Sequence, residues 1–154
     1  MKEITVKKGT VIQRKGDLNS RVYHVVSGLL RSYAIDSKGK EHIFMFAPEG
    51  WVIADSNPAD VPCDLYIDAL EDAVLKILPK DLERERNNSL AFIKRMGVLQ
   101  KRVIMLMSAS ALQRYEHFEE TYPDIVQRVT QKMIASYLGI TPEALSTVRR
   151  KRSK

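Results

Sequence analysis

The sequence predicts an α+β protein: an antiparallel β jelly-roll barrel, then a long helix and a small C-terminal helix-turn-helix. Glycines punctuate the first half of the chain, and Gly16, Gly28, Gly39 and Gly50 stand 11 or 12 residues apart, which is typical of short strands joined by turns. Helical spacing of apolar residues replaces strand alternation after about residue 82. A helix–glycine–helix pattern with a basic second helix lies near the C-terminus.

The composition fits one domain, or one domain with a small appendage, because 154 residues that are 44% hydrophobic can bury a core. The single cysteine, Cys63, excludes an intramolecular disulfide framework, a four-cysteine iron–sulfur site and a cysteine-rich zinc site. The opening MKEITVKK has no apolar signal-peptide core. The longest charge-free apolar stretch, residues 103–112, is about half of the roughly 20 residues that a membrane span needs. We therefore expect a cytoplasmic protein without a membrane partner.

The first part, residues 1–80, is expected to form the barrel. Strand-like runs cover residues 10–14, 22–26, 29–35, 41–46, 65–69 and 73–78. Within residues 31–35, every second residue is apolar or aromatic, as in a half-buried strand. Residues 36–40, Asp-Ser-Lys-Gly-Lys, lie between two such runs and are typical of a hairpin turn.

The second part, residues 81–109, is expected to be one long helix that begins near Leu82. Its a/d seam consists of Phe92, Met96, Leu99, Val103 and Leu106. Ile93, Ile104, Met107 and Ala111 make a second apolar face, so the helix would cover two surfaces, the barrel and a second copy of itself. The pattern favours a homodimer through the seam. The alternative is a helix packed in a monomeric core, because five seam positions are few for a coiled coil.

The third part, residues 110–154, is expected to contain an amphipathic helix near residues 112–118 and then the helix-turn-helix. Thr130 is suited to cap a helix over residues 131–138, and Gly139 to end it in a left-handed conformation. Thr141 can cap a second helix, which Pro142 opens. The two helices would share an apolar interface made by Ile134, Ala135, Leu138, Ile140, Leu145 and Val148.

The second helix carries most of the excess positive charge. The formal net charge is +6, and five positive charges lie in the last six residues, RRKRSK. Such a run attracts phosphate, and on a helix-turn-helix it indicates double-stranded DNA as the partner. We expect Arg149, Lys151, Arg152 and Lys154 to neutralise phosphates.

The exposed face of the same helix is expected to enter the major groove. Besides the cap Thr141, it presents Glu143, Ser146, Thr147 and Arg150 at i, i+3, i+4 and i+7 spacing. Arg150 could bind a guanine edge, and Ser146 and Thr147 a base or a phosphate. Glu143 could accept a hydrogen bond from a cytosine amino group, or could only compensate the helix dipole.

Together these patterns resemble the Crp/Fnr family of bacterial transcription regulators, and the resemblance covers nearly the whole chain. It is carried by VYHVVSG at residues 22–28, the hairpin at 36–40, PEGWVI at 48–53 and IASYLGITPEALS at 134–146. The last motif is similar to a Bacteroidetes-like branch whose members often lack the C-terminal wing. The resemblance implies a cyclic-nucleotide-binding-like barrel, a homodimer through the long helix and one recognition helix for each half-site of a palindromic operator. RNA polymerase is a further candidate partner.

The chain departs from the family's effector pocket. The resemblance places Asp55 where cyclic-nucleotide binders carry a glutamate for the ribose, and Cys63-Asp64 where they carry Arg-Ser for the cyclic phosphate. Leu99 and Gln100 stand roughly where the long helix would offer hydroxyl groups to the base. No arginine or lysine lies between Lys40 and Lys76, and Asp64 would repel a phosphate. We expect a degenerate pocket that does not bind cAMP, with no cofactor and an unknown effector.

Other departures are smaller. Thr147 stands where related recognition helices commonly carry arginine, so one guanine contact, worth about 1–3 kcal/mol of discrimination, is expected to be missing. The usual N-terminal helical segment is also expected to be missing. Cys63 has no basic neighbour and is expected to fill space rather than act as a redox switch. The histidines, His24, His42 and His117, lack a paired ligand at i+3 or i+4, so no metal or haem site is expected.

Two functions remain open. The first is a sequence-specific, dimeric transcription regulator. The alternative is a ligand-sensing or protein-docking module of the cyclic-nucleotide-binding type, with weak or no specific DNA binding. An enzyme is not expected, because the sequence has no glycine-rich phosphate loop, metal-ligand pair or nucleophile–base pattern.

Overall fold

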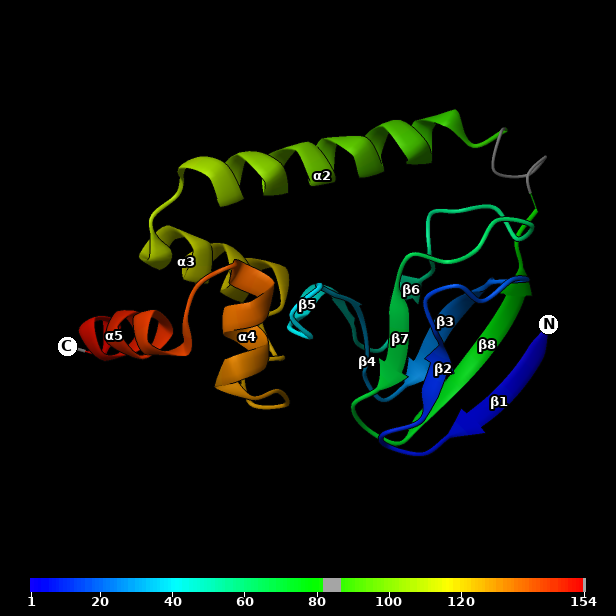
Figure 1. Ribbon diagram of the computed structural model, residues 1–154, viewed down its shortest axis with the longest axis horizontal. Helices are drawn as coiled ribbons and strands as arrows, with labels where there is room; N and C mark the ends of the chain where they lie inside the picture. Colours follow the sequence, from blue (N-terminus) through cyan, green and yellow to red (C-terminus); the bar gives the residue numbers. More distant parts are fainter. Residues whose placement is uncertain (82–86, 154) are drawn as a thin grey trace. The chain divides into compact units, whose positions relative to one another are not determined.

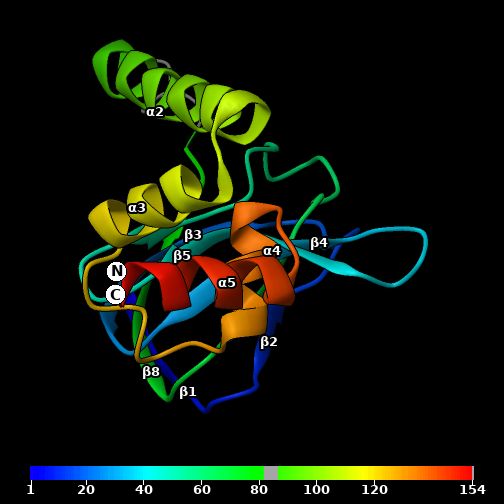
Figure 2. The ribbon, with the colours of Figure 1, turned by 90° about the vertical axis from the view of Figure 1, so that its left-hand side faces the viewer.

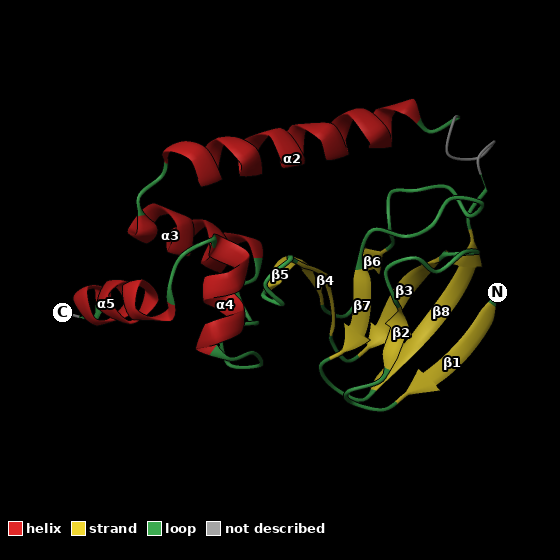
Figure 3. Ribbon diagram, viewed as in Figure 1, coloured by secondary structure: helices red, strands yellow, loops and turns green. Residues whose placement is uncertain are grey.

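The computed structural model describes residues 1–81 and 87–153, and the chain divides into two compact units (Figure 1). The β unit, Met1–Leu82, contains the described strands, and the helical unit, Glu83–Lys154, contains the described helices (Figure 3). The predicted fold class, a jelly-roll barrel combined with a helix-turn-helix, is confirmed. The expected start of the long helix near Leu82 lies outside the described residues.

The β unit consists of two antiparallel sheets, in the orders β1-β8-β3-β6 and β2-β7-β4-β5. The strands are β1 (Lys2–Val6), β2 (Val11–Gln13), β3 (Arg21–Ser27), β4 (Leu30–Ile35), β5 (Glu41–Ala47), β6 (Val52–Ile53), β7 (Tyr66–Ala69) and β8 (Ala73–Pro79). Six of them lie on the predicted runs. The sequence did not predict β1, which is mostly exposed, or β6, which has two residues and therefore shows no periodicity.

One apolar core lies between the two sheets. Both contribute to it, with Tyr23, Val25, Ile53 and Leu75 from the first sheet and Leu30, Ala47, Ile67 and Ala69 from the second. Full burial of one such large side chain contributes roughly 1.5–3 kcal/mol. The alternating pattern in the sequence therefore selects which face of each strand is buried.

Arg31 makes an ion pair on the outer face of the second sheet. Arg31 of β4 and Asp68 of β7 are register partners, and the Arg31 Nε and Nη2 atoms donate to the two carboxylate oxygens of Asp68 at 2.8 and 3.0 Å. The Arg31 Nη1 atom donates to Glu41 of β5 at 2.8 Å. Burial works against the charged guanidinium, but the hydrogen bonds and charges of Asp68 and Glu41 raise the pKa of Arg31. Arg31 thus links three neighbouring strands, β7 through the bidentate pair with Asp68 and β5 through the hydrogen bond to Glu41.

The predicted hairpin turn at residues 36–40 is present between β4 and β5. The Asp36 carboxylate accepts hydrogen bonds from the backbone N–H groups of Lys38 and Lys40, at 2.9 and 3.0 Å. Asp36 Oδ2 also lies 2.8 Å from His42 Nε2, and this hydrogen bond is the main reason that the pKa of Asp36 is lowered. Gly39 supplies the positive φ, +81°, that the turn requires.

The helical unit consists of α2 (Ser89–Ser108), α3 (Ala111–Thr121), α4 (Gln131–Leu138) and α5 (Pro142–Arg152). A capping box opens α3, in which Ser110 Oγ accepts from the Gln113 N–H group and the Gln113 side chain accepts from the Ser110 N–H group. Helices α3, α4 and α5 pack against one another (Figure 2). They form the part of the unit that the sequence assigned to residues 110–154.

Helix α2 exposes most of its apolar side chains. Four of the predicted seam residues, Phe92, Met96, Leu99 and Val103, are 38–64% exposed. Leu106 differs, because it is half-buried and its Cδ2 atom lies 3.7 Å from where a Cβ on Gly139 would stand. Leu106 therefore faces the turn between α4 and α5 of its own chain, and its place in the seam stays a prediction. On the second apolar face, Ile93, Ile104 and Met107 are also exposed, whereas Ala111 does not belong to this helix, because α2 ends at Ser108 and Ala111 is the first residue of α3.

We predict that Gly28→Ala strongly destabilises the β unit. Gly28 has a φ of +92°, and a Cβ there would lie 2.4 Å from the Asp72 carbonyl oxygen and 2.7 Å from the Ala73 Cβ. Backbone strain and overlap together should cost about 2–5 kcal/mol, measured by denaturant unfolding. Gly39→Ala is the control, because φ is +81° there but no atom lies within 4 Å, and it should cost about 1 kcal/mol. Equal losses for the two variants would contradict the assigned packing.

Candidate functional site

The two helices of the predicted helix-turn-helix are held by a shared apolar core. Helix α4 buries Ile134, Ala135, Tyr137 and Leu138, and α5 buries Leu145 and Val148. Tyr115 and Phe118 of α3 are also buried. The interface predicted from the sequence is therefore present, and α3 also contributes buried side chains to it.

Three aromatic rings complete this core, and the sequence did not single them out as a group. The ring centroids of Phe118, Tyr122 and Tyr137 are 5.5–5.6 Å apart in each pairing, with tilted or edge-on geometry. Burial raises the pKa of Tyr137. The i, i+4 spacing of Phe118 and Tyr122 could have indicated that these two rings are neighbours. The third ring, Tyr137, belongs to another helix, so no local pattern in the sequence places it beside them.

The predicted caps and turn fix the orientation of α5. Thr130 Oγ1 accepts a hydrogen bond from the Met133 N–H group at 3.2 Å, and Thr141 Oγ1 accepts one from the Ala144 N–H group at 3.1 Å. Gly139 ends α4 with a φ of +66°. Thr130 caps the start of α4, and Gly139 and Thr141 lie in the turn, so local sequence determines where α4 starts and stops and where α5 starts.

The predicted DNA-reading residues lie on α5 and differ in exposure. Thr141, Glu143, Ser146, Arg150, Lys151 and Arg152 are exposed, whereas Thr147 and Arg149 are half-buried. The Ser146 hydroxyl donates to Gln131 Oε1 of α4 at 3.3 Å. The Thr147 hydroxyl donates to the Glu143 carbonyl one turn earlier, at 3.1 Å. The hydroxyl of Thr147 is thus satisfied within its own helix, and that of Ser146 reaches the start of α4.

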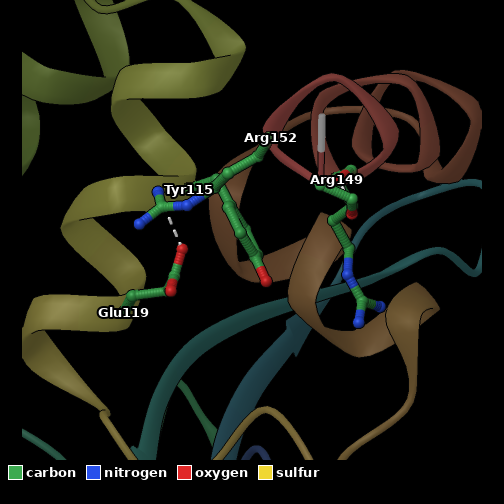
Figure 4. A pocket seen from close by; sticks show the side chains of 5 residues that line it. Tyr115, Glu119, Arg149 and Arg152 are labelled. Carbon is green, nitrogen blue, oxygen red and sulfur yellow. Dashed lines mark hydrogen bonds and ion pairs between the residues drawn. The ribbon is translucent and has the colours of Figure 1, made fainter.

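Arg152 is engaged within the helical unit. Its Nη1 atom lies 2.9 Å from Glu119 Oε1 and 3.8 Å from Glu116 Oε1, both on α3. Figure 4 shows this pair beside Tyr115, in a pocket that Arg149 and Ser153 also line. The pair is partly exposed and therefore weak, about 0–1 kcal/mol. A phosphate would compete with it, so the assignment of Arg152 to phosphate stays a prediction. Lys154 lies outside the described residues.

The second candidate site, the effector pocket, centres on a loop of the β unit that is folded around Asp55. The Asp55 carboxylate is buried and accepts hydrogen bonds from the backbone N–H groups of Asn57, Asp64 and Leu65, at 2.8, 2.9 and 2.9 Å. Asn57 Nδ2 donates to the Pro62 carbonyl and to Asp64 Oδ2. The Asp55 carboxylate thus takes up three backbone N–H donors of this loop.

Lys80 supplies a cation to the same loop. The sequence analysis did not predict this cation, because Lys80 lies beyond the stretch between Lys40 and Lys76 that has no lysine or arginine. Its ammonium group donates to Ser20 Oγ and the Asp55 carbonyl, both at 2.7 Å, and to the Asn57 carbonyl. These three oxygens match the three donors of an ammonium group. Lys80 is therefore committed to holding the loop.

The other pocket candidates are distributed as follows. Cys63 is 2% exposed, and burial raises the pKa of its thiol, which disfavours the reactive thiolate. Asp64 lies in the Asp55 loop, and its side chain is exposed. Leu99 and Gln100 belong to α2 in the other unit, where both are exposed, so their role in a pocket stays a prediction. Among residues 1–81 and 87–153, no three His, Cys, Asp or Glu side chains could hold a metal ion.

Comparison with known proteins supports both halves of this architecture. Residues 3–85 match the model of the cyclic nucleotide-binding domain family. The nitrogen fixation regulation protein FixK of Rhizobium meliloti (strain 1021) is 26% identical over 159 residues, which covers 94% of this chain and 72% of that protein.

Two solved structures share the fold over 99% of this chain. FixK2 from Bradyrhizobium japonicum has a TM-score of 0.80 at 20% identity, with 84% of that chain covered. A CRP/FNR-family transcriptional regulator from Thermus thermophilus has a TM-score of 0.79 at 18% identity, with 86% covered. Within the described part of the chain, no helix is long and apolar enough to cross a membrane.

Proposed function

We propose that this chain, which belongs to the cyclic nucleotide-binding domain family and is a transcription regulator of the Crp/Fnr type, binds specific double-stranded DNA. We further propose that it binds the DNA as a homodimer and does not use cAMP as its effector. Its matched relatives are regulators rather than enzymes. We expect it to act in the bacterial cytoplasm, and RNA polymerase stays a predicted partner.

DNA binding is supported above all by the position of the positive charge on α5. The helix begins at a capped turn, buries Leu145 and Val148 against its neighbours, and exposes Arg150 and Lys151 near its end. Arginine and lysine in the last turn also favour the helix dipole. A helix of this kind can enter the major groove while its cations neutralise phosphates.

Dimerisation through α2 is supported by the exposure of its apolar side chains. Phe92, Met96, Leu99 and Val103 follow the seam spacing, and a second copy of the helix could bury them. A symmetric dimer would also present two copies of α5 to the two halves of a palindromic operator.

The absence of cAMP binding is supported by the chemistry of the Asp55 loop. The Asp55 carboxylate accepts three backbone hydrogen bonds, and the Lys80 ammonium group is already bound to three oxygens. A cyclic phosphate would meet the Asp64 carboxylate there and would need a cation from elsewhere.

The first test measures DNA binding of a charge-neutralised α5. Arg149→Gln with Lys151→Gln, at two of the positions assigned to phosphates, should weaken binding to all sequences and make the dependence of log K on log salt shallower by about one for each phosphate that is no longer neutralised. The control, Arg14→Gln with Lys15→Gln, removes the same charge from exposed residues of the β unit and should leave binding unchanged. An unchanged salt slope in the α5 variant would refute the phosphate assignment. No retention of DNA by the wild-type chain at low salt would favour the alternative ligand-sensing or protein-docking module.

The second test measures the oligomeric state of seam variants by sedimentation. Met96→Glu puts a charge into the proposed interface and should shift the protein from dimer to monomer. Lys101→Glu is the control, because residue 101 lies about 180° around the helix from Phe92 at 3.6 residues per turn, and it should remain dimeric. A dimeric Met96→Glu protein would contradict the seam.

The third test is a calorimetric titration of the full chain with cAMP. We expect no binding at micromolar ligand concentration, because the loop has no uncommitted cation for the phosphate. Micromolar or tighter affinity would overturn this part of the proposal and leave the DNA-binding part intact.

A further inference from the structure

Arg114, near the start of α3, joins the ends of two other helices. Its Nη2 atom donates to the Leu106 carbonyl of α2 at 2.6 Å, and its Nε atom donates to the Ala109 carbonyl between α2 and α3 at 3.2 Å. Its Nη1 atom donates to the carbonyls of Leu138 and Gly139 at the end of α4, at 3.0 and 3.4 Å. One guanidinium therefore binds four carbonyl oxygens, two at the C-terminal end of α2 and two at the C-terminal end of α4.

These contacts have a clear electrostatic cause. The carbonyl groups of the last turn of a helix have no partners within the helix, and the helix dipole makes that end negative. Arg114 places a permanent positive charge where the C-terminal ends of α2 and α4 meet. Lysine could not reproduce the arrangement, because its ammonium group cannot span carbonyls in such different directions.

The turn between α4 and α5 is part of the same contact. A Cβ on Gly139 would lie 3.6 Å from the Arg114 Nη1 atom and 3.7 Å from the Leu106 Cδ2 atom. One turn earlier on α2, Arg102 donates from Nη2 to the Tyr137 carbonyl at 3.4 Å, and its Cζ atom lies 4.1 Å from the centroid of the Tyr137 ring. The C-terminal part of α2 is thus fixed to the end of α4, immediately before α5 begins.

We propose that Arg114 is a positioning residue that sets the spacing of the two DNA half-sites. The inference rests on the proposed function, in which α2 forms the dimer seam and α5 reads the DNA. Because Arg114 binds α2 and the α4–α5 turn at once, it fixes the angle between the dimer axis and each recognition helix. That angle determines how far apart, and in which relative rotation, two half-sites must lie.

Spacer length is a sensitive readout of this role. One added or removed base pair rotates a half-site by about 35° and moves it by about 3.4 Å, so a rigid dimer should discriminate against altered spacers. A dimer whose α5 helices can reorient should tolerate them. A merely structural role for Arg114 would lower the stability of the protein or its affinity for every spacer alike.

The experiment compares full-length variants on an operator selected by the wild-type chain from random DNA, with spacers shortened or lengthened by one and two base pairs. We expect the wild-type protein to lose about tenfold or more in affinity on altered spacers, and Arg114→Met to lose about threefold or less. Arg114→Lys should be intermediate, and the preference for bases within each half-site should be unchanged. Arg14→Met is the matched control, because it removes an exposed arginine of the β unit and should keep wild-type discrimination. Full discrimination in a folded Arg114→Met protein would overturn the proposal.

A second measurement does not depend on DNA and separates the two proposals. Nitroxide labels at Lys101→Cys and Arg150→Cys, in a Cys63→Ser background diluted with unlabelled chains, report the distance between α2 and α5 within one protomer. We expect a narrow distance distribution with Arg114 and a broad one in Arg114→Met. An equally narrow distribution in the variant would overturn the role of Arg114. The wild-type chain could fail to bind DNA while the distance distribution still broadens in Arg114→Met. That result would overturn the DNA-binding function and the role of Arg114 in half-site spacing, but not its role in holding α2 against the α4–α5 turn.

Discussion

The helical unit depends on the burial of apolar side chains among α3, α4 and α5. Helices of 8 and 11 residues, such as α4 and α5, are too short to be stable alone in water. They persist because Leu138, Leu145 and the ring of Tyr137 are buried against their neighbours. The surface of α5 is polar and basic and contributes little to this stability. The proposed DNA-reading face can therefore vary in sequence while the core beneath it holds its shape.

Asp55 and Lys80 of the β unit are bound within the chain, whereas Arg150 and Lys151 of the helical unit are exposed to solvent. In the β unit, Asp55 and Lys80 are satisfied by oxygen and nitrogen atoms of the chain itself, so the loop that resembles an effector cassette is closed by internal contacts. In the helical unit, Arg150 and Lys151 are exposed at the end of α5. This contrast supports the proposal of a regulator that binds DNA and does not take cAMP as its effector.

The features that the sequence predicted well are local ones. Thr130, Gly139 and Thr141 act within a few residues of their own positions, so the bounds of α4 and the start of α5 followed directly from sequence. Lys80 was missed because its partners Ser20, Asp55 and Asn57 are 23–60 residues away in the chain. The contact of Leu106 with the turn between α4 and α5 was missed for the same reason, because Gly139 is 33 residues away in the chain.

The exposed apolar side chains of α2 have a thermodynamic consequence. Contact of Phe92, Met96 and Val103 with water is unfavourable, so any surface that covers them adds to the free energy of unfolding. If that surface is a second copy of the chain, folding and association become one equilibrium, and the stability of this protein is then a function of its concentration. Dilution alone would lower its melting temperature, although every interaction within the chain stayed the same.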